Sequence, residues 1–130
     1  MTVLAFTVVV TLGAFGAGLL GALKDEGVNF VAIWGYPFGK RKARLDLVPE
    51  DADQFKKAAK KLKLDLGKKR TAFHITGDDH PGAVAEALAK LAEKKIRVHA
   101  VQALCAGNGR FGAMIEVDAG DTRKAAKILA

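Results

Sequence analysis

The sequence predicts an α+β protein that consists of two repeats of one small unit. Each repeat is expected to be an antiparallel sheet with helices on one face, and the two repeats are expected to pack side by side. The main observation is internal similarity. The segment KKAAKKL at 56–62 returns as RKAAKIL at 123–129, and AFTV at 5–8 returns as AFHI at 72–75, in both cases after 67 residues. A period this long, present twice, indicates a duplicated domain rather than a solenoid.

The composition supports a globular protein of this size. The chain has 130 residues, of which 50% are hydrophobic and 27% are charged, enough for one medium domain or two small ones. We therefore place the two repeats at residues 1–68 and 69–130. The single cysteine, Cys105, excludes an internal disulfide and a CxxC pair, and it favours a cytoplasmic protein.

The net charge of +7 is the main argument for a nucleic-acid partner. However, the excess is mostly lysine between Lys56 and Arg70. Lysines on the outer face of a helix commonly serve solvation. We therefore expect no nucleic-acid partner.

The second repeat shows each expected element in order. Arg70–Gly77 is rich in β-forming residues and ends at a turn cluster, which predicts a strand. Pro81 suits the first turn of a helix, and the apolar residues from Val84 to Ala92 follow helical spacing. The remaining predicted elements are strands at Ile96–Cys105 and Phe111–Val117, the turn GNG at 107–109, and a helix from Asp121 or Thr122 to Leu129.

The first repeat follows the same order. Its predicted elements are a strand at Leu4–Thr11, a helix from about Gly18 to Glu26, strands at Val28–Tyr36 and Ala43–Val48, a helix from Asp51, and a short fourth strand at Leu64–Leu66. The second repeat ends at its helix, so its fourth strand is missing or is supplied by another segment. Strand–helix–strand–strand–helix–strand is the ferredoxin-like βαββαβ pattern.

The uncharged stretch at 2–23 leaves one alternative open, a membrane-tethered protein anchored by these residues. The stretch is long enough for a spanning helix. However, four glycines crowd its second half, and Val8–Val10 favours a strand. No Lys or Arg precedes Lys24, whereas a secretory signal has a basic start. We therefore expect a strand and a helix here, and no membrane partner.

The loop TGDDHPGAVAEAL at 76–88 carries the strongest chemical signal. Acidic residues follow a strand, and then His80, Pro81 and Gly82 open a helix. The free N–H groups of a first helical turn can bind a carboxylate, and Asp79 beside them can hold an ammonium group. Together these groups describe a site for an amino-acid zwitterion. The simpler alternative is that Asp79 or His80 only caps the helix.

These motifs resemble those of a known family. Asp-His-Pro-Gly after a strand, a helix that ends near LAEKKI, and LKDEGVNF at 23–30 are similar to the ACT domain, a ferredoxin-like regulatory module. The resemblance covers nearly the whole chain as two tandem copies. It implies a small-molecule ligand, usually an amino acid, at the interface of two paired units. The ligand-binding residues that it implies are Asp79, His80, Gly82 and Ala83 in the second repeat and Asn29 in the first.

The first repeat departs from the family pattern. The segment LGAFGAG at 12–18 has neither Asp nor Pro, and Arg97 stands in the second repeat where the first has Asn29. A reciprocal site of Gly13–Gly18 with Arg97 is therefore expected to be degenerate or to take a more anionic ligand.

From these features we expect a non-catalytic regulatory protein without a cofactor or metal. It would bind an amino acid and act allosterically on a separate partner protein. The alternative is an RNA-binding protein, because RNA-recognition motifs share the βαββαβ order and NGRFGAMIEV at 108–117 faintly resembles their third-strand signature. The second stacking ring of that signature is absent, and the strand at 43–48 has no aromatic residue.

The strand Val28–Tyr36 bears on assembly. It is apolar on both alternating faces, which we expect to be formed by Phe30, Ala32 and Trp34 on one side and by Val31 and Ile33 on the other. A solvent-facing strand alternates apolar with polar residues. We therefore expect a second copy of the chain to cover one face, in a homodimer.

Overall fold

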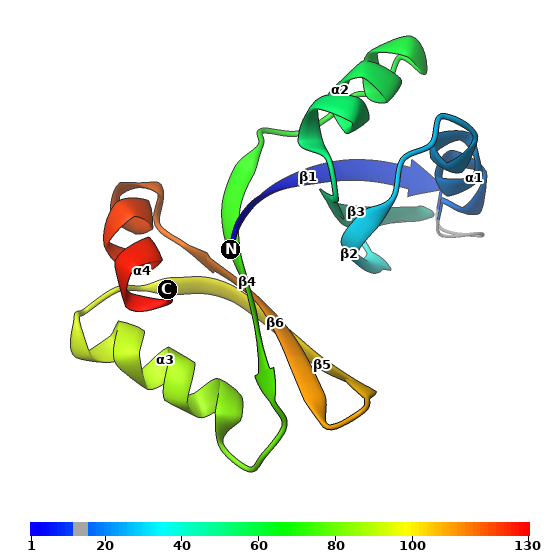
Figure 1. Cartoon of the computed structure of the whole chain (residues 1–130). Coiled ribbons are helices and arrows are strands. Elements are labelled where there is room, and N and C mark those ends of the chain that lie inside the picture. The colour runs from blue at the N-terminus through cyan, green and yellow to red at the C-terminus, as the bar shows by residue number, and fades with distance from the viewer. Residues whose placement is uncertain (12–15) are drawn as a thin grey trace. The chain divides into compact units, whose positions relative to one another are not determined.

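The computed structural model describes residues 1–11 and 16–130, which divide into two compact units. The first unit is Leu4–Lys69, and the second unit is Arg70–Ala130 together with Met1–Val3. Figure 1 shows the elements in chain order, which are β1 (Thr2–Thr11), α1 (Ala17–Asp25), β2 (Phe30–Pro37), β3 (Lys42–Pro49), α2 (Ala52–Lys61), β4 (Arg70–Asp78), α3 (Ala83–Glu93), β5 (Val98–Gly107), β6 (Arg110–Val117), the 3-10 helix η1 (Ala119–Asp121) and α4 (Thr122–Ile128). The predicted α+β class with two ferredoxin-like repeats is confirmed.

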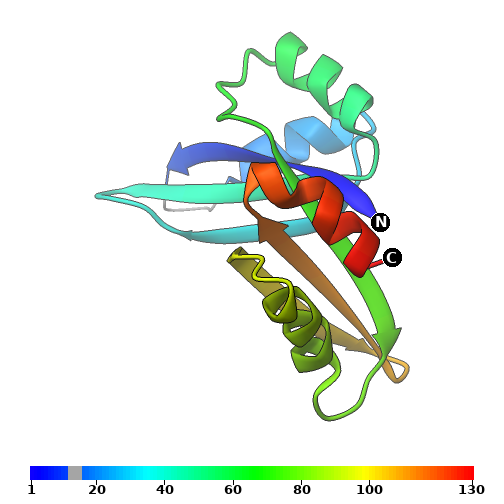
Figure 2. The same cartoon turned by 90° about the vertical axis from the view of Figure 1, so that its left-hand side faces the viewer.

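Three antiparallel strands form the sheet of each unit. Their order is β2-β3-β1 in the first unit and β4-β6-β5 in the second. In both sheets the third strand of the repeat lies between the two strands that the first helix connects, which is the split-βαβ arrangement. Within the second unit, α3 and α4 lie on the same face of the sheet (Figures 1 and 2).

The core of the first unit forms between its sheet and the inner faces of α1 and α2. Phe55 of α2 is fully buried, and its ring lies 4.9 Å from that of Phe6 and 6.0 Å from that of Phe30. Asp51 fixes the start of α2, because its Oδ1 accepts the N–H groups of Asp53 and Gln54 at 3.0 and 3.1 Å. The predicted helix from Asp51 is confirmed.

The core of the second unit repeats this arrangement with different side chains. Phe73 of β4 faces Ile115 of β6, and both are buried beneath Leu91 of α3 and Ala125 of α4. A side chain directly opposite another on a neighbouring strand lies on the same face of the sheet. The odd-numbered residues of β4 and β6 therefore face the helices, and the even-numbered residues lie on the open face.

The apolar stretch at 2–23 is divided between two elements, β1 and α1. The alternative of one membrane-spanning helix over residues 2–23 is therefore wrong for the described part of this stretch. No helix among residues 1–11 and 16–130 has the length and apolar character needed to cross a membrane.

The fourth strand of the first repeat differs from the prediction, whereas in the second repeat another segment supplies this edge, as expected. Leu64–Leu66 is not a strand, and Gly67 just after it donates its N–H to the carbonyl oxygen of Thr7 in β1 at 2.9 Å. In the second unit, Met1 lies beside β4, where it donates to and accepts from the backbone of His74 at 2.9 and 2.8 Å. The beginning of the chain thus occupies the β4 edge where a fourth strand would pair.

A bulge in β2 overturns the predicted assignment of its faces. Phe30 pairs with Pro49, but Ala32 pairs with Val48, so the register shifts by one residue between them. Because side chains alternate with a period of two, a shift by one residue exchanges the two faces. Phe30 therefore packs into the core, whereas Ala32 and Trp34 lie on the open face.

Candidate functional site

A pocket of about 400 Å³ opens at the start of α3, in the second unit. It brings together four of the five residues that the sequence predicts as ligand-binding, Asp79, His80, Gly82 and Ala83. The other lining residues are Val84, Ala85, Ala103, Leu104, Cys105 and Phe111. The loop at 76–88 and the β5–β6 hairpin therefore meet around one cavity.

Backbone contacts fix the shape of the loop between β4 and α3. The N–H of Asp79 donates to the carbonyl oxygen of Gly109 at 2.8 Å, which ties the loop to the β5–β6 hairpin. Gly82 has φ +86°, a left-handed conformation that glycine adopts without strain. Nothing lies within 4 Å of the place where a Cβ on Gly82 would be, so this position leaves room for a ligand.

The first turn of α3 has no side-chain cap. The simpler alternative, in which Asp79 or His80 caps this helix, is therefore wrong. Ala83 N donates to His80 O at 3.1 Å and Glu86 N to Gly82 O at 2.9 Å. Within the described chain the N–H groups of Val84 and Ala85 have no acceptor, and both residues line the pocket. These two donors and the positive end of the helix dipole favour an anion here.

Asp79 and Cys105 face each other across the pocket. A hydrogen bond from the thiol to the Asp79 carboxylate raises the pKa of Cys105 above its ordinary value, and slight desolvation and the carboxylate charge raise it further. Cys105 is an exposed free cysteine. The neutral thiol leaves Asp79 as the source of negative charge among the residues that line the pocket. This carboxylate can accept hydrogen bonds from an ammonium group.

The remaining wall of the pocket is apolar. It consists of Val84, Ala103, Leu104 and Phe111. Phe111 lies over Gly77, and a Cβ on Gly77 would come within 2.9 Å of the Phe111 ring. The sequence analysis missed these wall residues, because they reach the pocket through the pairing of β4, β5 and β6 and not through the loop motif.

Asn29, the fifth predicted residue, belongs to the first unit and is engaged there. Its side-chain Nδ2 donates to Glu50 Oε2 at 2.7 Å, and its backbone carbonyl oxygen accepts the backbone N–H of Glu50 at 2.9 Å. The pocket at α3 is lined by the second unit alone, so Asn29 is not among its residues. Its role toward a ligand stays a prediction.

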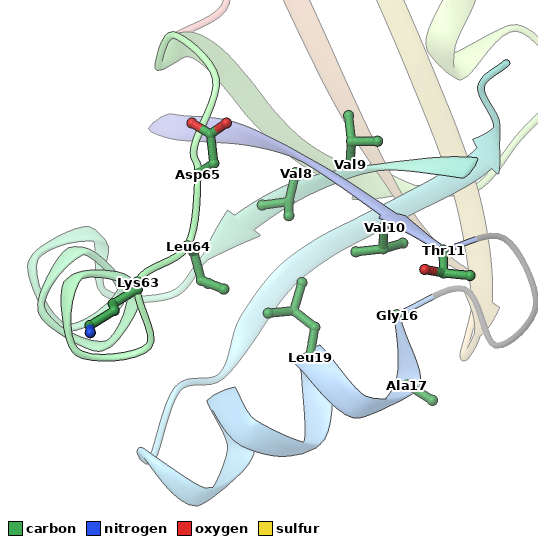
Figure 3. A pocket seen from close by; sticks show the side chains of 10 residues that line it. All are labelled: Val8, Val9, Val10, Thr11, Gly16, Ala17, Leu19, Lys63, Leu64 and Asp65. Carbon is green, nitrogen blue, oxygen red and sulfur yellow. The ribbon is translucent and has the colours of Figure 1, made fainter. Parts of the chain in front are cut away.

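A second pocket, of about 500 Å³, opens at the start of α1 in the first unit. Val8, Val10, Leu19 and Leu64 turn their aliphatic side chains toward it (Figure 3). Its remaining lining residues are Val9, Thr11, Gly16, Ala17, Lys63 and Asp65.

Gly16 stands before α1 as Gly82 stands before α3, with φ +78° and no side-chain cap. Of the predicted reciprocal site, Gly16 lines this pocket and Gly13 lies outside the described residues. Arg97 belongs to the second unit, and its role in a reciprocal site stays a prediction. Over residues 1–11 and 16–130, no group of three or more His, Cys, Asp and Glu residues is placed to hold a metal ion.

No family profile and no curated protein matches the sequence. Solved structures match over the whole chain. Protein BT0572 from Bacteroides thetaiotaomicron superimposes with a TM-score of 0.83 at 18% identity, over 99% of this chain and 87% of that one. The ligand-free regulatory subunit of aspartate kinase from Thermus thermophilus gives 0.63 at 14% identity, over 98% and 89%.

A third structure, a C-terminal regulatory domain of aspartate kinase from Porphyromonas gingivalis, gives a TM-score of 0.56 at 14% identity, over 98% of this chain and 89% of that one. At these identities the likeness concerns the fold. The fold is that of ACT-type regulatory domains, as the sequence motifs predict.

Proposed function

We propose that this ACT-type chain is a non-catalytic regulatory protein that binds an amino acid in the pocket at the start of α3. One observation carries the proposal. The pocket places an acceptor for an ammonium group, Asp79, beside the free N–H groups of Val84 and Ala85, which suit a carboxylate. A free amino acid presents these two groups on one carbon atom. The solved structures of similar fold that are regulatory subunits or domains support the regulatory role.

Regulation requires that the ligand stabilise one arrangement of the protein over another. In this proposal the ligand draws the loop at 79–82 and the β5 edge together, and a separate partner protein binds one of the two arrangements. Asn29 would add an amide contact to the ligand, as the family resemblance implies.

We also propose that the protein is a cytoplasmic homodimer. Its one cysteine is a free thiol, which suits a reducing compartment. β5 is the last strand in the order β4-β6-β5, and Val101 and Leu104 on it are 46% and 69% exposed. An unpaired apolar strand edge is a template for pairing with another chain. Sedimentation at micromolar concentration is expected to give twice the monomer mass of 13.8 kDa.

A thermal-shift screen against the common free amino acids tests the binding proposal. A ligand at about one hundred times its Kd should add about 2.7 kcal/mol to the free energy of unfolding. Titration calorimetry then compares Asp79→Asn and Asn29→Ala with Asp25→Asn, a control that removes the same charge as Asp79→Asn at the end of α1. Asp79→Asn should weaken binding about tenfold or more, and Asp25→Asn should leave it unchanged. No response to any amino acid would contradict the proposal.

A further inference from the structure

The open face of the first sheet carries a regular array of side chains. The register places the members of three rows directly opposite one another, so each row lies on one face. Phe38 extends the array by one residue beyond β2, because its N–H donates to the carbonyl oxygen of Lys42 at 2.9 Å. The rows, from β2 through β3 to β1, are Trp34–Asp46–Thr7, Tyr36–Arg44–Val9 and Phe38–Lys42–Thr11.

Aromatic rings line one side of this array. Trp34 and Phe38 are each 49% exposed, and Tyr36 between them is half-buried. They are three of the nine aromatic residues in the chain. Large aromatic side chains are usually buried in the core. Their exposure at alternate positions along one edge of the sheet therefore indicates a role for this surface.

Positive charge accompanies the rings. Lys40 and Arg41 form the turn between β2 and β3, and Lys42 and Arg44 follow on the array itself. The guanidinium of Arg44 lies 5.8 Å from the centre of the Tyr36 ring. We call the surface formed by Trp34, Tyr36, Phe38 and the four basic residues the hairpin face.

We propose that the hairpin face binds single-stranded nucleic acid. Its rings offer faces on which bases can stack, and its lysines and arginines offer charges to the phosphates. Residues two apart on a strand lie about 6.7 Å from each other, roughly twice the 3.4 Å spacing of stacked bases. Each ring would therefore stack on a separate base of an extended strand. A duplex keeps its bases stacked inside and cannot offer them to the rings.

Charge complementarity decides against the other occupants of such a face. Arg44 is paired with Asp46 of the same array at 3.4 Å, which leaves the charges of Lys40, Arg41 and Lys42. A second copy of the chain would bring the same three cations against the first in a two-fold contact, and like charges oppose that contact. An acidic protein surface would satisfy the cations and leave the exposed rings of Trp34 and Phe38 without a planar partner. A nucleic acid strand supplies both bases and phosphates.

The bulge in β2 explains why the sequence did not predict a nucleic-acid-binding face on this sheet. The expectation of no nucleic-acid partner rested on the lysines between Lys56 and Arg70, which were assigned to solvation. The case against an RNA-recognition motif rested on the strand at 43–48, which has no aromatic residue, and on the surroundings of Phe111. The structure places Phe111 on the helix side of the second sheet, in the pocket at α3. The exposed rings lie on β2 instead, and the shift between Phe30 and Ala32 turns Trp34 to the open face.

Trp34 supplies a built-in reporter, because it is the only tryptophan in the chain. Its fluorescence is recorded while an oligonucleotide of about twelve nucleotides is added to the full-length protein. One arm uses RNA of mixed sequence, one uses DNA of the same sequence, and one uses the matching duplex. Stacking is expected to quench the emission with either single strand, whichever sugar is preferred, and the duplex is expected to bind more weakly.

Variants separate stacking from general attraction between opposite charges. In fluorescence anisotropy with labelled oligonucleotide, Trp34→Ala or Phe38→Ala should weaken binding about tenfold or more, whereas Ile33→Ala, at an exposed residue on the other face of β2, should not. Removing Lys40 and Lys42 together should lower the slope of log affinity against log salt by about 1.4. Removing Lys56 and Lys57 of α2 lowers the net charge by the same amount. It should change the salt slope and the affinity less than removal of Lys40 and Lys42 does. Circular dichroism verifies that each variant is folded.

The inference is overturned by any of four results. The first is unchanged Trp34 emission on addition of single strands, and the second is binding of the duplex or of polyglutamate as tight as that of the single strands. The third is an equal loss of oligonucleotide affinity on removal of the α2 lysine pair and of the hairpin lysine pair. The fourth is a monomer–dimer equilibrium that Trp34→Ala abolishes while oligonucleotide binding is absent. Quenching together with the loss on Trp34→Ala and Phe38→Ala supports it.

Discussion

At the scale of single residues, the pocket at α3 rests on a carboxylate and a thiol. The loop motif TGDDHPG was enough to predict that Asp79, His80 and Gly82 lie together, because they are within four residues of one another, and all three line the pocket. Their role toward a ligand stays a prediction. The pKa of the Cys105 thiol is raised, which keeps the thiol in its less reactive, protonated form. Its place beside Asp79 was not predictable, because it depends on the register of β5 against β6.

The contact between Asp79 and Cys105 predicts a change in thiol reactivity. Asp79→Asn removes the negative charge and the hydrogen-bond acceptor that raise the pKa of Cys105, so that pKa should fall. At a fixed pH below the pKa, a larger thiolate fraction then gives faster alkylation. Rates of iodoacetamide labelling from about pH 7 to 9.5 check this. Asp25→Asn serves as the control, and an unchanged rate profile in Asp79→Asn would contradict the assignment.

Gly77 predicts a second effect on the pocket. In Gly77→Ala the new methyl group would lie 2.9 Å from the Phe111 ring, so the ring must move and the pocket wall changes shape. We expect a loss of about 1 kcal/mol in the free energy of unfolding and weaker amino-acid binding. Gly112→Ala is the matched control on the neighbouring strand, because its methyl group would meet His74 at 3.7 Å, an ordinary contact. Equal effects of the two substitutions in urea unfolding and calorimetry would exclude this role of Phe111.

At the scale of elements, α2 differs from the two helices that border the pockets. Asp51 caps α2 from an extended conformation, whereas α1 and α3 begin at left-handed glycines without a cap. The sequence indicated the start of α2 at Asp51, since Asp before an apolar helical pattern has a local meaning. It placed the start of α1 near Gly18 and did not indicate the left-handed Gly16. It did not indicate the bulge in β2, because neither Val31 nor its neighbours have an intrinsic preference for a bulge.

The cap of α2 predicts a measurable contribution to stability. Asp51→Ala leaves the N–H groups of Asp53 and Gln54 without their acceptor, and we expect a loss of about 1 kcal/mol in the free energy of unfolding. Asp25→Ala, at the C-terminal end of α1, removes the same charge without a cap and should be neutral or slightly stabilising. Urea unfolding of both variants distinguishes the cap from a general effect of charge.

At the scale of the whole molecule, the period of 67 residues was sufficient to predict two units with one order of elements, because duplicated sequence keeps its hydrophobic pattern. The edges of the sheets were not predictable in the same way. Leu64–Leu66 has a strand-like composition but is not a strand, and Gly67 just after it bonds to β1. In the second unit, Met1 takes the place beside β4. Which segment completes an edge depends on competition between distant parts of the chain.

The strand β1 has a thermodynamic consequence, because Thr2 and Val3 belong to the second unit and the rest of the strand belongs to the first. Unfolding one unit removes the anchor of a strand that the other needs. We therefore expect one cooperative melting transition, with calorimetric and van't Hoff enthalpies that agree. The emission of Trp34 reports the first unit, and hydrogen exchange at the amide of His74 reports the second. Two separate midpoints for these probes would show that the shared strand does not couple the units.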